Sequence, residues 1–322
     1  MRTPSDTILR KIKQTWSLSQ KFRFIRKVEN WIYKDEEKAL FIRVTEPSHR
    51  SKLQLEAELN WMFYLQQKGI QLVHPLPSPK GHLVEKFSDD HEEFYVSVFE
   101  EAAGQPLIGK EDFTPNRLKN WGKLIGSLHS AAANYQKPSN IESRPDWETE
   151  RTFFYNQDIF ISANPLYNHY QKFLTWLYSL PQTKQNFGLI HADIHQGNFF
   201  VDENDQFTLF DFDDCHNNWF VYDIATPLFG LSMSMRKSCP PEEIAQMHEY
   251  LLEGYQEKGC LTEEDLGLLP HFILFRHFSI YSFAQKNLEN NTLSDNTKDW
   301  MHMAIKYCGD FIENYDFESL NI

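Results

Sequence analysis

The stretch GLIHADIHQGNFFVDENDQFTLFDFDD, residues 188–214, decides the fold of this chain. Its polar loop, 191–198, is too rich in turn-forming residues to be a buried strand. Two short apolar runs follow, 199–201 and 207–210, and the acidic segment between them, 202–205, has the composition of a tight turn. The sequence therefore predicts a β-hairpin that follows directly on the polar loop.

Three oxygen-bearing side chains, Asp193, Asn198 and Asp211, are expected near the base of this hairpin. Carboxylate and amide oxygens suit a hard cation such as Mg²⁺. The order His-x-Asp-x-x-x-x-Asn, followed after a hairpin by Asp-Phe-Asp, is the order of parts in a phosphoryl-transfer catalytic loop. There the first aspartate accepts the proton of the attacking hydroxyl, and the other two side chains hold magnesium. These roles fall to Asp193 as the base and to Asn198 and Asp211 as the metal ligands.

Two other interpretations of the same stretch stay open. His191, Asp193 and His195 form an H-x-D-x-H pattern, and histidine with carboxylate suits zinc or iron. In an extended segment the three side chains point the same way, which permits a shared ion, but Asn198 and Asp211 are then unexplained. The remaining interpretation is a surface hairpin with no site.

The stretch resembles the aminoglycoside phosphotransferase and choline kinase family, which has a protein-kinase-like fold. HADIHQGN, 191–198, is similar to the family's catalytic loop, and DFD, 211–213, stands where protein kinases have DFG. The pattern is most similar to the bacterial stress response kinase A and homoserine kinase type II-like branches. The resemblance implies an α+β fold of two lobes, with a small antiparallel β-sheet and one helix in the first lobe and mostly helices in the second.

The resemblance also divides the chain. It implies an N-terminal nucleotide-binding lobe over 1–99, a hinge over 100–107 and a helical catalytic and substrate lobe over 108–322. The hinge has the small residues and the Gly-x-Pro segment of an exposed link. Backbone groups around Glu100 to Ala102 are then expected to bind the adenine. The predicted strands of the first lobe are 22–28, 31–34, 39–45, 81–87 and 94–99, and its helices are 5–19 and 48–68. The main helices predicted for the last lobe are 115–129, 167–180, 241–259, 262–286 and 296–315.

A cation inside the apolar strand 39–45 needs a reason, because burying an unpaired charge is costly. The resemblance places Arg43 where kinases have the lysine that holds the nucleotide phosphates, and a guanidinium also forks onto phosphate oxygens. On the following helix, Glu58 falls on the apolar stripe and Glu56 falls outside it, so we predict an ion pair between Arg43 and Glu58. The loop at 29–30, between the first two predicted strands, contains no glycine. The resemblance implies that Asn30 in this loop binds phosphate.

Four further residues of the motif have supporting roles in the resemblance. His191 is expected to hold the loop by hydrogen bonds, and Asp223 to brace it. His195 either donates to the γ-phosphate or faces solvent. Asp213 either joins the metal or substrate pocket or, with Asp214, caps the next helix.

Composition bounds the partners. A net charge of −13 argues against a nucleic-acid partner and allows a cationic substrate. The four cysteines are scattered, and the chain has neither a long uncharged apolar run nor an apolar N-terminal signal core, so we expect a cytoplasmic protein without a membrane partner. One run on a predicted helix is interpreted as packing rather than as substrate contact: Arg276, His277, Tyr281 and Gln285.

The sequence as a whole predicts an ATP-dependent phosphotransferase that uses Mg²⁺. The expected acceptor is a hydroxyl of a small molecule of the aminoglycoside, homoserine or amino alcohol type. Two alternatives remain: a protein Ser/Thr kinase resembling stress response kinase A, and a kinase-fold binding protein that has lost turnover.

Overall fold

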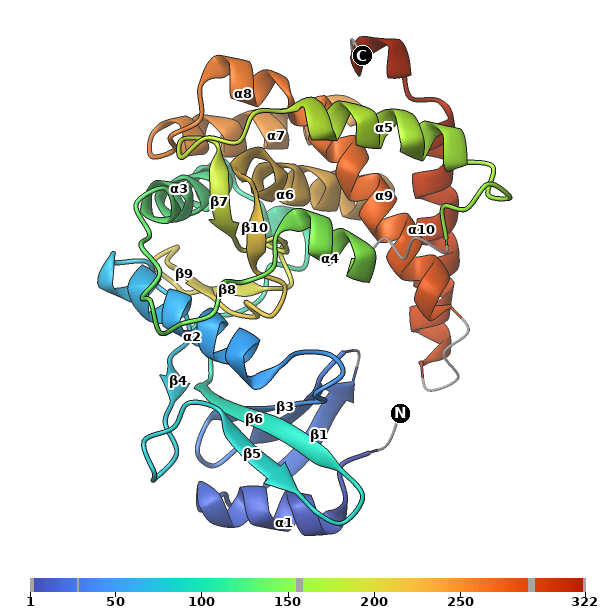
Figure 1. Ribbon diagram of the computed structural model, residues 1–322. Coiled ribbons are helices and arrows are strands. Elements are labelled where there is room, and N and C mark those ends of the chain that lie inside the picture. Colours follow the sequence, from blue (N-terminus) through green and yellow to red (C-terminus); the bar gives the residue numbers. More distant parts are fainter. Residues whose placement is uncertain (1–2, 28, 155–158, 289–292, 321–322) are drawn as a thin grey trace. The chain divides into compact units, whose positions relative to one another are not determined.

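The computed structural model describes residues 3–27, 29–154, 159–288 and 293–320, and the chain forms two compact units (Figure 1). Unit 1 comprises Met1–Pro106, Tyr135–Arg144 and Asn198–Asp213, and unit 2 comprises Leu107–Asn134, Pro145–Gly197 and Asp214–Ile322. The first unit thus combines the N-terminal third of the chain with the hairpin that the sequence singled out. Each unit is described by itself below.

An antiparallel sheet is the centre of unit 1, in the order β1-β2-β3-β6-β4, with β5 also paired to β6. Along β2 buried and half-buried residues alternate, as expected for a strand with one face on a core. Two buried residues of helix α1 (Asp6–Thr15), Ile8 and Ile12, complete that core. The strands are β1 (Phe22–Lys27), β2 (Trp31–Asp35), β3 (Leu40–Thr45), β4 (Pro75–Leu76), β5 (Glu85–Ser88) and β6 (Glu93–Glu100). The sheet has six strands where the sequence predicted five. The missed strand is β4, because two residues are too few to show a period in the sequence.

Helix α2 (Lys52–Gln67) starts with a capping box in which Ser51 and Gln54 satisfy each other's backbone N–H groups. Gly69 follows the C-cap residue Lys68, and its φ of +83° suits glycine. Its buried face carries the expected leucines together with Glu58.

The predicted hairpin is confirmed. Strand β8 (Phe199–Val201) pairs antiparallel with β9 (Phe207–Leu209), and the turn closes with a hydrogen bond of 3.0 Å from the Asp202 N–H to the Gln206 carbonyl. The hairpin is tied into unit 1 by backbone bridges from Val201 to Gln105 and from Leu209 to Leu72.

Unit 2 is mostly helical, with one two-stranded sheet of β7 (Phe187–Ile190) and β10 (His216–Trp219). Its helices are α3 (Pro115–Ala132), α4 (Trp147–Phe154), α5 (Tyr167–Ser179), α6 (Phe220–Met235), α7 (Pro241–Gln256), α8 (Glu263–Gly267), α9 (Leu269–Asn287) and α10 (Asp295–Glu313). The described residues also form two 3₁₀ turns in unit 2, η1 (Lys110–Asp112) and η2 (Phe317–Leu320).

Two helix predictions for this unit need correction. The single helix expected over 262–286 is two helices, because Pro270 stands in the first turn of α9 and cannot continue a helix from α8. Helix α6 was not predicted, since it is buried almost all round and therefore shows no amphipathic period. Helices α3 and α7 pack backbone to backbone: a Cβ on Gly122 would lie 1.9 Å from the Leu251 carbonyl oxygen. In the described part of the chain, no helix has the length and apolar character to cross a membrane.

Candidate active site

The structure forms the Arg43–Glu58 ion pair that the sequence predicts. Both guanidinium NH groups donate to the carboxylate, at 2.9 and 2.7 Å, and the two side chains are 5% and 0% exposed. Burial opposes the charge on Arg43, but Glu58 and then Asp213 raise its pKa above the usual value. Glu56 instead forms a half-exposed pair with Lys52. The Nε of Arg43 is buried without a hydrogen-bond partner among the described residues.

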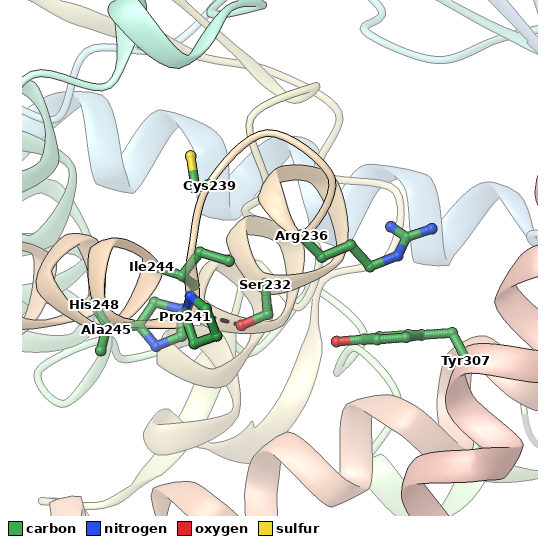
Figure 2. A pocket seen from close by; sticks show the side chains of 8 residues that line it. All are labelled: Ser232, Arg236, Cys239, Pro241, Ile244, Ala245, His248 and Tyr307. Carbon is green, nitrogen blue, oxygen red and sulfur yellow. Dashed lines mark hydrogen bonds between the residues drawn. The ribbon is translucent and has the colours of Figure 1, made fainter.

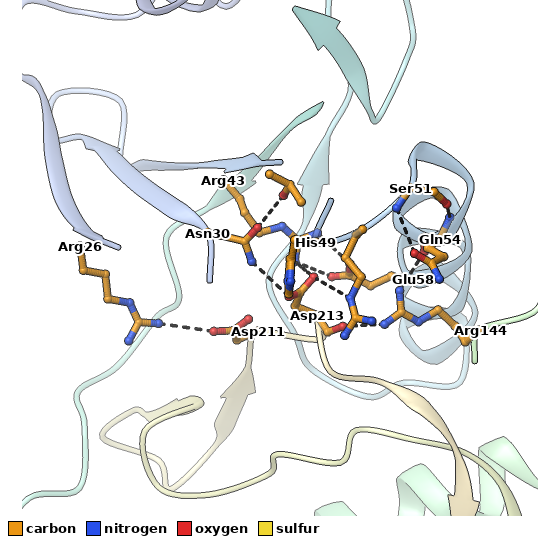
Figure 3. Close-up of polar contacts among 12 residues, drawn as sticks. Arg26, Asn30, Arg43, His49, Ser51, Gln54, Glu58, Arg144, Asp211 and Asp213 are labelled. Atoms are coloured by element: carbon orange, nitrogen blue, oxygen red, sulfur yellow. Dashed lines mark hydrogen bonds and ion pairs between the residues drawn. The ribbon is translucent and has the colours of Figure 1, made fainter. Parts of the chain in front are cut away.

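Asp213 is the centre of a polar cluster in unit 1 (Figure 3). Its carboxylate accepts a hydrogen bond from the Asn30 amide at 3.1 Å and lies 2.6 Å from Nε2 of His49. The guanidinium groups of Arg43 and Arg50 are each 3.8 Å away. Burial opposes ionisation of Asp213, but His49 and these two arginines hold its pKa well below the usual range. The cluster therefore connects the expected phosphate ligands, Asn30 and Arg43, to the end of the DFD segment.

The alternative role of Asp213, as a cap of the next helix, is wrong. The segment that follows is strand β10, and α6 begins only at Phe220. Arg144 adds a further contact to this segment, because its guanidinium donates to the Asp213 carbonyl at 2.5 Å and to the Gln54 carbonyl at 3.1 Å.

Asn198 and Asp211 lie at the same end of the β8–β9 hairpin. The Phe210 N–H donates to the Asn198 carbonyl at 3.0 Å, so Asp211 directly follows the residue paired with Asn198. Asp211 has a φ of +62°, and its carboxylate, about one third exposed, lies 3.4 Å from the Arg26 guanidinium. One amide and one carboxylate oxygen at one hairpin end fit a hard divalent cation.

The transition-metal interpretation of H-x-D-x-H finds no support. Nδ1 of His191 accepts the Asp193 N–H at 3.3 Å, and Nδ1 of His195 accepts the Gly197 N–H at 2.9 Å, so both rings are committed to the loop backbone. In the described ranges, the three ligand-type residues that do converge are Glu29, His49 and Asp213. Two arginines beside Asp213 make that cluster unfavourable for a further cation.

Asp193, the predicted base, is held in unit 2 by two partners. The Arg276 guanidinium donates to its Oδ1, and Nε2 of His195 is 3.3 Å from its Oδ2. Burial opposes ionisation, but His195 and Arg276 outweigh it and hold the pKa of Asp193 well below the usual range. The carboxylate is therefore charged and oriented. His195 faces Asp193, while its expected contact with a γ-phosphate stays a prediction.

Asp223 braces the loop by hydrogen bonds to its backbone, as expected. Its two oxygens accept the N–H groups of His191 at 2.9 Å and Ala192 at 2.6 Å, and it is fully buried. Ala192 has a φ of +69°, a strained conformation for a residue with a Cβ, which these charge-assisted bonds stabilise. His129 lies 3.4 Å from Asp223 and 3.1 Å from the Tyr255 hydroxyl, in the core as predicted.

The segment expected to bind adenine begins at the last residue of β6, Glu100. The Glu100 N–H donates to the His74 carbonyl and the Glu101 N–H to the Ala39 carbonyl, both within unit 1. Glu100 therefore has only its carbonyl side to offer, and the N–H that stays a candidate is that of Ala102.

Sequence reasoning missed four of these side chains: His49, Arg50, Arg144 and Arg276. The first two form a basic pair directly before α2, which was a usable signal. Arg276 was interpreted as packing together with its neighbours. That interpretation is right for His277 and Tyr281, which are buried against aromatic rings, and wrong for Arg276.

Unit 2 also contains an open cavity of about 360 Å³ between the end of α6, the start of α7 and α10 (Figure 2). Ser232 lies 3.3 Å from Nε2 of His248 in its wall, and the Arg236 guanidinium lies over the Tyr307 ring. Burial lowers the pKa of His248, so this histidine is neutral at pH 7. None of the predicted site residues lines this cavity.

A model of the phosphotransferase enzyme family matches residues 22–259, about three quarters of the chain. The chain belongs to the phosphotransferase enzyme family. Amicoumacin kinase of Bacillus subtilis (strain 168) is 28% identical over 286 residues, which cover 87% of this chain and 84% of that protein. A solved amicoumacin kinase, hAmiN with AMP-PNP, Ca²⁺ and Ami, superposes with a TM-score of 0.84 at 25% identity, over 99% of this chain and 97% of that one. A microcompartment-associated aminopropanol kinase gives a TM-score of 0.76 at 20% identity, over 97% of both chains.

The comparisons confirm the predicted family and the α+β protein-kinase-like fold. The chain is a kinase with a hydroxyl acceptor, and it uses ATP with a divalent metal ion. Amicoumacin kinase and the aminopropanol kinase are, by their names, kinases of small molecules, which supports a small-molecule hydroxyl as the acceptor.

Proposed function

We propose that this enzyme phosphorylates the hydroxyl of a small molecule that also carries an amino group. The observation that supports this best is Asp193, a partly buried carboxylate in contact with Arg276 on the loop where the family has its base. The net charge of −13 favours a cationic acceptor over an anionic one. The aminopropanol kinase among the similar structures acts, by its name, on an amino alcohol.

Asp193 is the group that contacts the acceptor in this proposal. It accepts the hydrogen bond of the hydroxyl and takes its proton as the new O–P bond forms and the bond from the γ-phosphorus to the leaving ADP oxygen breaks. Because phosphoryl transfer has a loose transition state, the hydroxyl loses its proton late, and orientation matters more than basicity. A fixed carboxylate of low pKa is adequate for this task.

The residues of unit 1 bind the nucleotide in the same proposal. Arg43, braced by Glu58, holds phosphate oxygens, and Asn30 adds a donor from the preceding loop. Asn198 and Asp211 hold the divalent cation, which neutralises phosphate charge when it is bound. Backbone groups of Glu100 and Ala102 bind the adenine.

The test is Mg²⁺-ATP binding and turnover over a panel of amino alcohols, aminoglycosides, homoserine and a generic protein acceptor. We expect Asp193→Asn to lose turnover by about 10²- to 10⁴-fold while ATP affinity stays within about twofold. We expect Asp211→Ala to lose metal-dependent ATP binding. Glu203→Gln is the matched control, since it removes an exposed acid from the turn of the same hairpin.

Transfer to an amino-bearing small molecule, lost in Asp193→Asn and kept in Glu203→Gln, would support the proposal. Transfer to the protein acceptor alone would replace it with the protein-kinase alternative. If the wild type binds nucleotide but phosphorylates no member of the panel, the result would favour the alternative of a kinase-fold binding protein without turnover.

A further inference from the structure

The catalytic stretch has a carboxylate base but no permanent cation of its own. Residues 186–214 contain neither lysine nor arginine. A partly buried aspartate without a cation beside it is more easily protonated, because burial disfavours its charged form. A permanent cation beside Asp193 must therefore come from another part of the chain.

Arg276 supplies this charge from helix α9, 83 residues further along the chain and in the same unit. One NH₂ group of its guanidinium donates to Oδ1 of Asp193. The other lies 3.4 Å from the Tyr222 hydroxyl and 3.5 Å from the Ala192 carbonyl oxygen. The Arg276 side chain is 12% exposed, so water screens the ion pair little.

His195 is a second partner of the carboxylate, and it comes from the loop itself. Its Nδ1 accepts the Gly197 N–H at 2.9 Å, and its Nε2 faces Oδ2 of Asp193 at 3.3 Å. An arginine is charged at every pH at which the enzyme works, so Arg276 is a permanent positive charge in contact with this carboxylate.

We propose that Arg276 is the positioning residue of the catalytic base: it keeps Asp193 ionised and orients its carboxylate toward the acceptor hydroxyl. This inference rests on the proposed function, in which Asp193 is the base. Among the described residues, the titratable or charged groups beside the carboxylate are Arg276 from α9 and His195 from the loop, while His191 accepts the Asp193 backbone N–H. Beside the arginine lie Tyr222 from α6 and Cys308 from α10, which interacts electrostatically with Arg276.

The inference predicts a pH profile that a purely structural arginine would not give. An opposite charge at contact distance lowers the pKa of an aspartate by roughly one to three units. Without Arg276, the acid limb of kcat against pH, which reports protonation of Asp193, should move up by that amount. ATP binding depends on residues of unit 1 and should not change.

The experiment compares wild type with Arg276→Gln and Arg276→Lys over pH 3–9, so that the acid limb falls inside the range, with KM for ATP measured at each pH. Lys286→Gln is the matched control, since it removes an exposed cation from the same helix. We expect Arg276→Gln to lower kcat by roughly 10- to 100-fold, with the acid limb shifted up and KM for ATP within about twofold of wild type. Arg276→Lys keeps the charge but loses the fork, so it should keep the wild-type acid limb with an intermediate kcat.

An acid limb that stays in place in Arg276→Gln would overturn the inference. If that variant does not fold, Arg276→Lys decides: an acid limb that moves up although the charge is kept would equally overturn the inference. The proposed function fails separately, if Asp193→Asn turns over normally. An inactive Asp193→Asn together with an unshifted Arg276→Gln would remove the inference and leave the proposed function intact.

Discussion

Removing the charge of Glu58 should destabilise the enzyme far more than removing the charge of Glu56, although both lie on α2. Glu58 is fully buried and forms two hydrogen bonds with Arg43, whereas Glu56 is half-exposed beside Lys52. Breaking a buried pair leaves the other ion uncompensated, at a cost of about 3–5 kcal/mol. Asp213, 3.8 Å from Arg43, still offsets part of that charge, so Glu58→Gln should cost about 3 kcal/mol. Glu56→Gln should cost less than about 0.5 kcal/mol.

The assay is urea unfolding of wild type and both variants, followed by circular dichroism, together with Mg²⁺-ATP titration. The double variant Arg43→Met, Glu58→Leu separates stability from binding. Replacing a buried ion pair by apolar side chains of similar volume is often neutral or stabilising, so its free energy of unfolding should return to within about 1 kcal/mol of wild type. Its affinity for ATP should still be lost, because the phosphate ligand is gone.

Two results would refute this reasoning. If Glu58→Gln and Glu56→Gln lose the same free energy of unfolding, burial does not set the cost of the broken pair. If the double variant binds ATP like wild type, Arg43 is a structural residue and not a nucleotide ligand.

Two further predictions concern unit 2. Burial lowers the pKa of His277 to about 3, so below pH 6.5 the unfolded chain binds a proton there that the folded chain does not bind. This residue should therefore lower the free energy of unfolding by about 1.4 kcal/mol for each pH unit below 6.5. His277→Phe can keep the stack on Phe311 and should lose this pH dependence in unfolding titrations; stability curves against pH that run parallel in variant and wild type would contradict it. In wild type, the two Asp223 oxygens accept the N–H groups of His191 and Ala192, and Asp223→Asn leaves one oxygen for both. We expect kcat to fall by roughly 10- to 100-fold with ATP affinity unchanged. A wild-type kcat in this variant would exclude the bracing role.

The catalytic hairpin and its oxygen ligands were predictable because their signal is local. Asn198 and Asp211 flank two short strands, and the turn between the strands consists of residues that form turns in any context. The Arg43–Glu58 pair was also predictable, since helical periodicity placed Glu58 on the buried face and one strand nearby contained a cation.

The contacts of Asp213 and Asp193 were decided only by the tertiary structure. His49 and Arg144 meet at Asp213, and Arg276 reaches Asp193 across 83 residues of chain. Periodicity in a sequence shows which face of an element is buried, but not which distant element packs on that face. The sequence by itself therefore determined the kind of chemistry, through residues close together in the chain. Which arginine holds the base in its charged state depended on the packing of α9, because partners far apart in the chain leave no common pattern in the sequence.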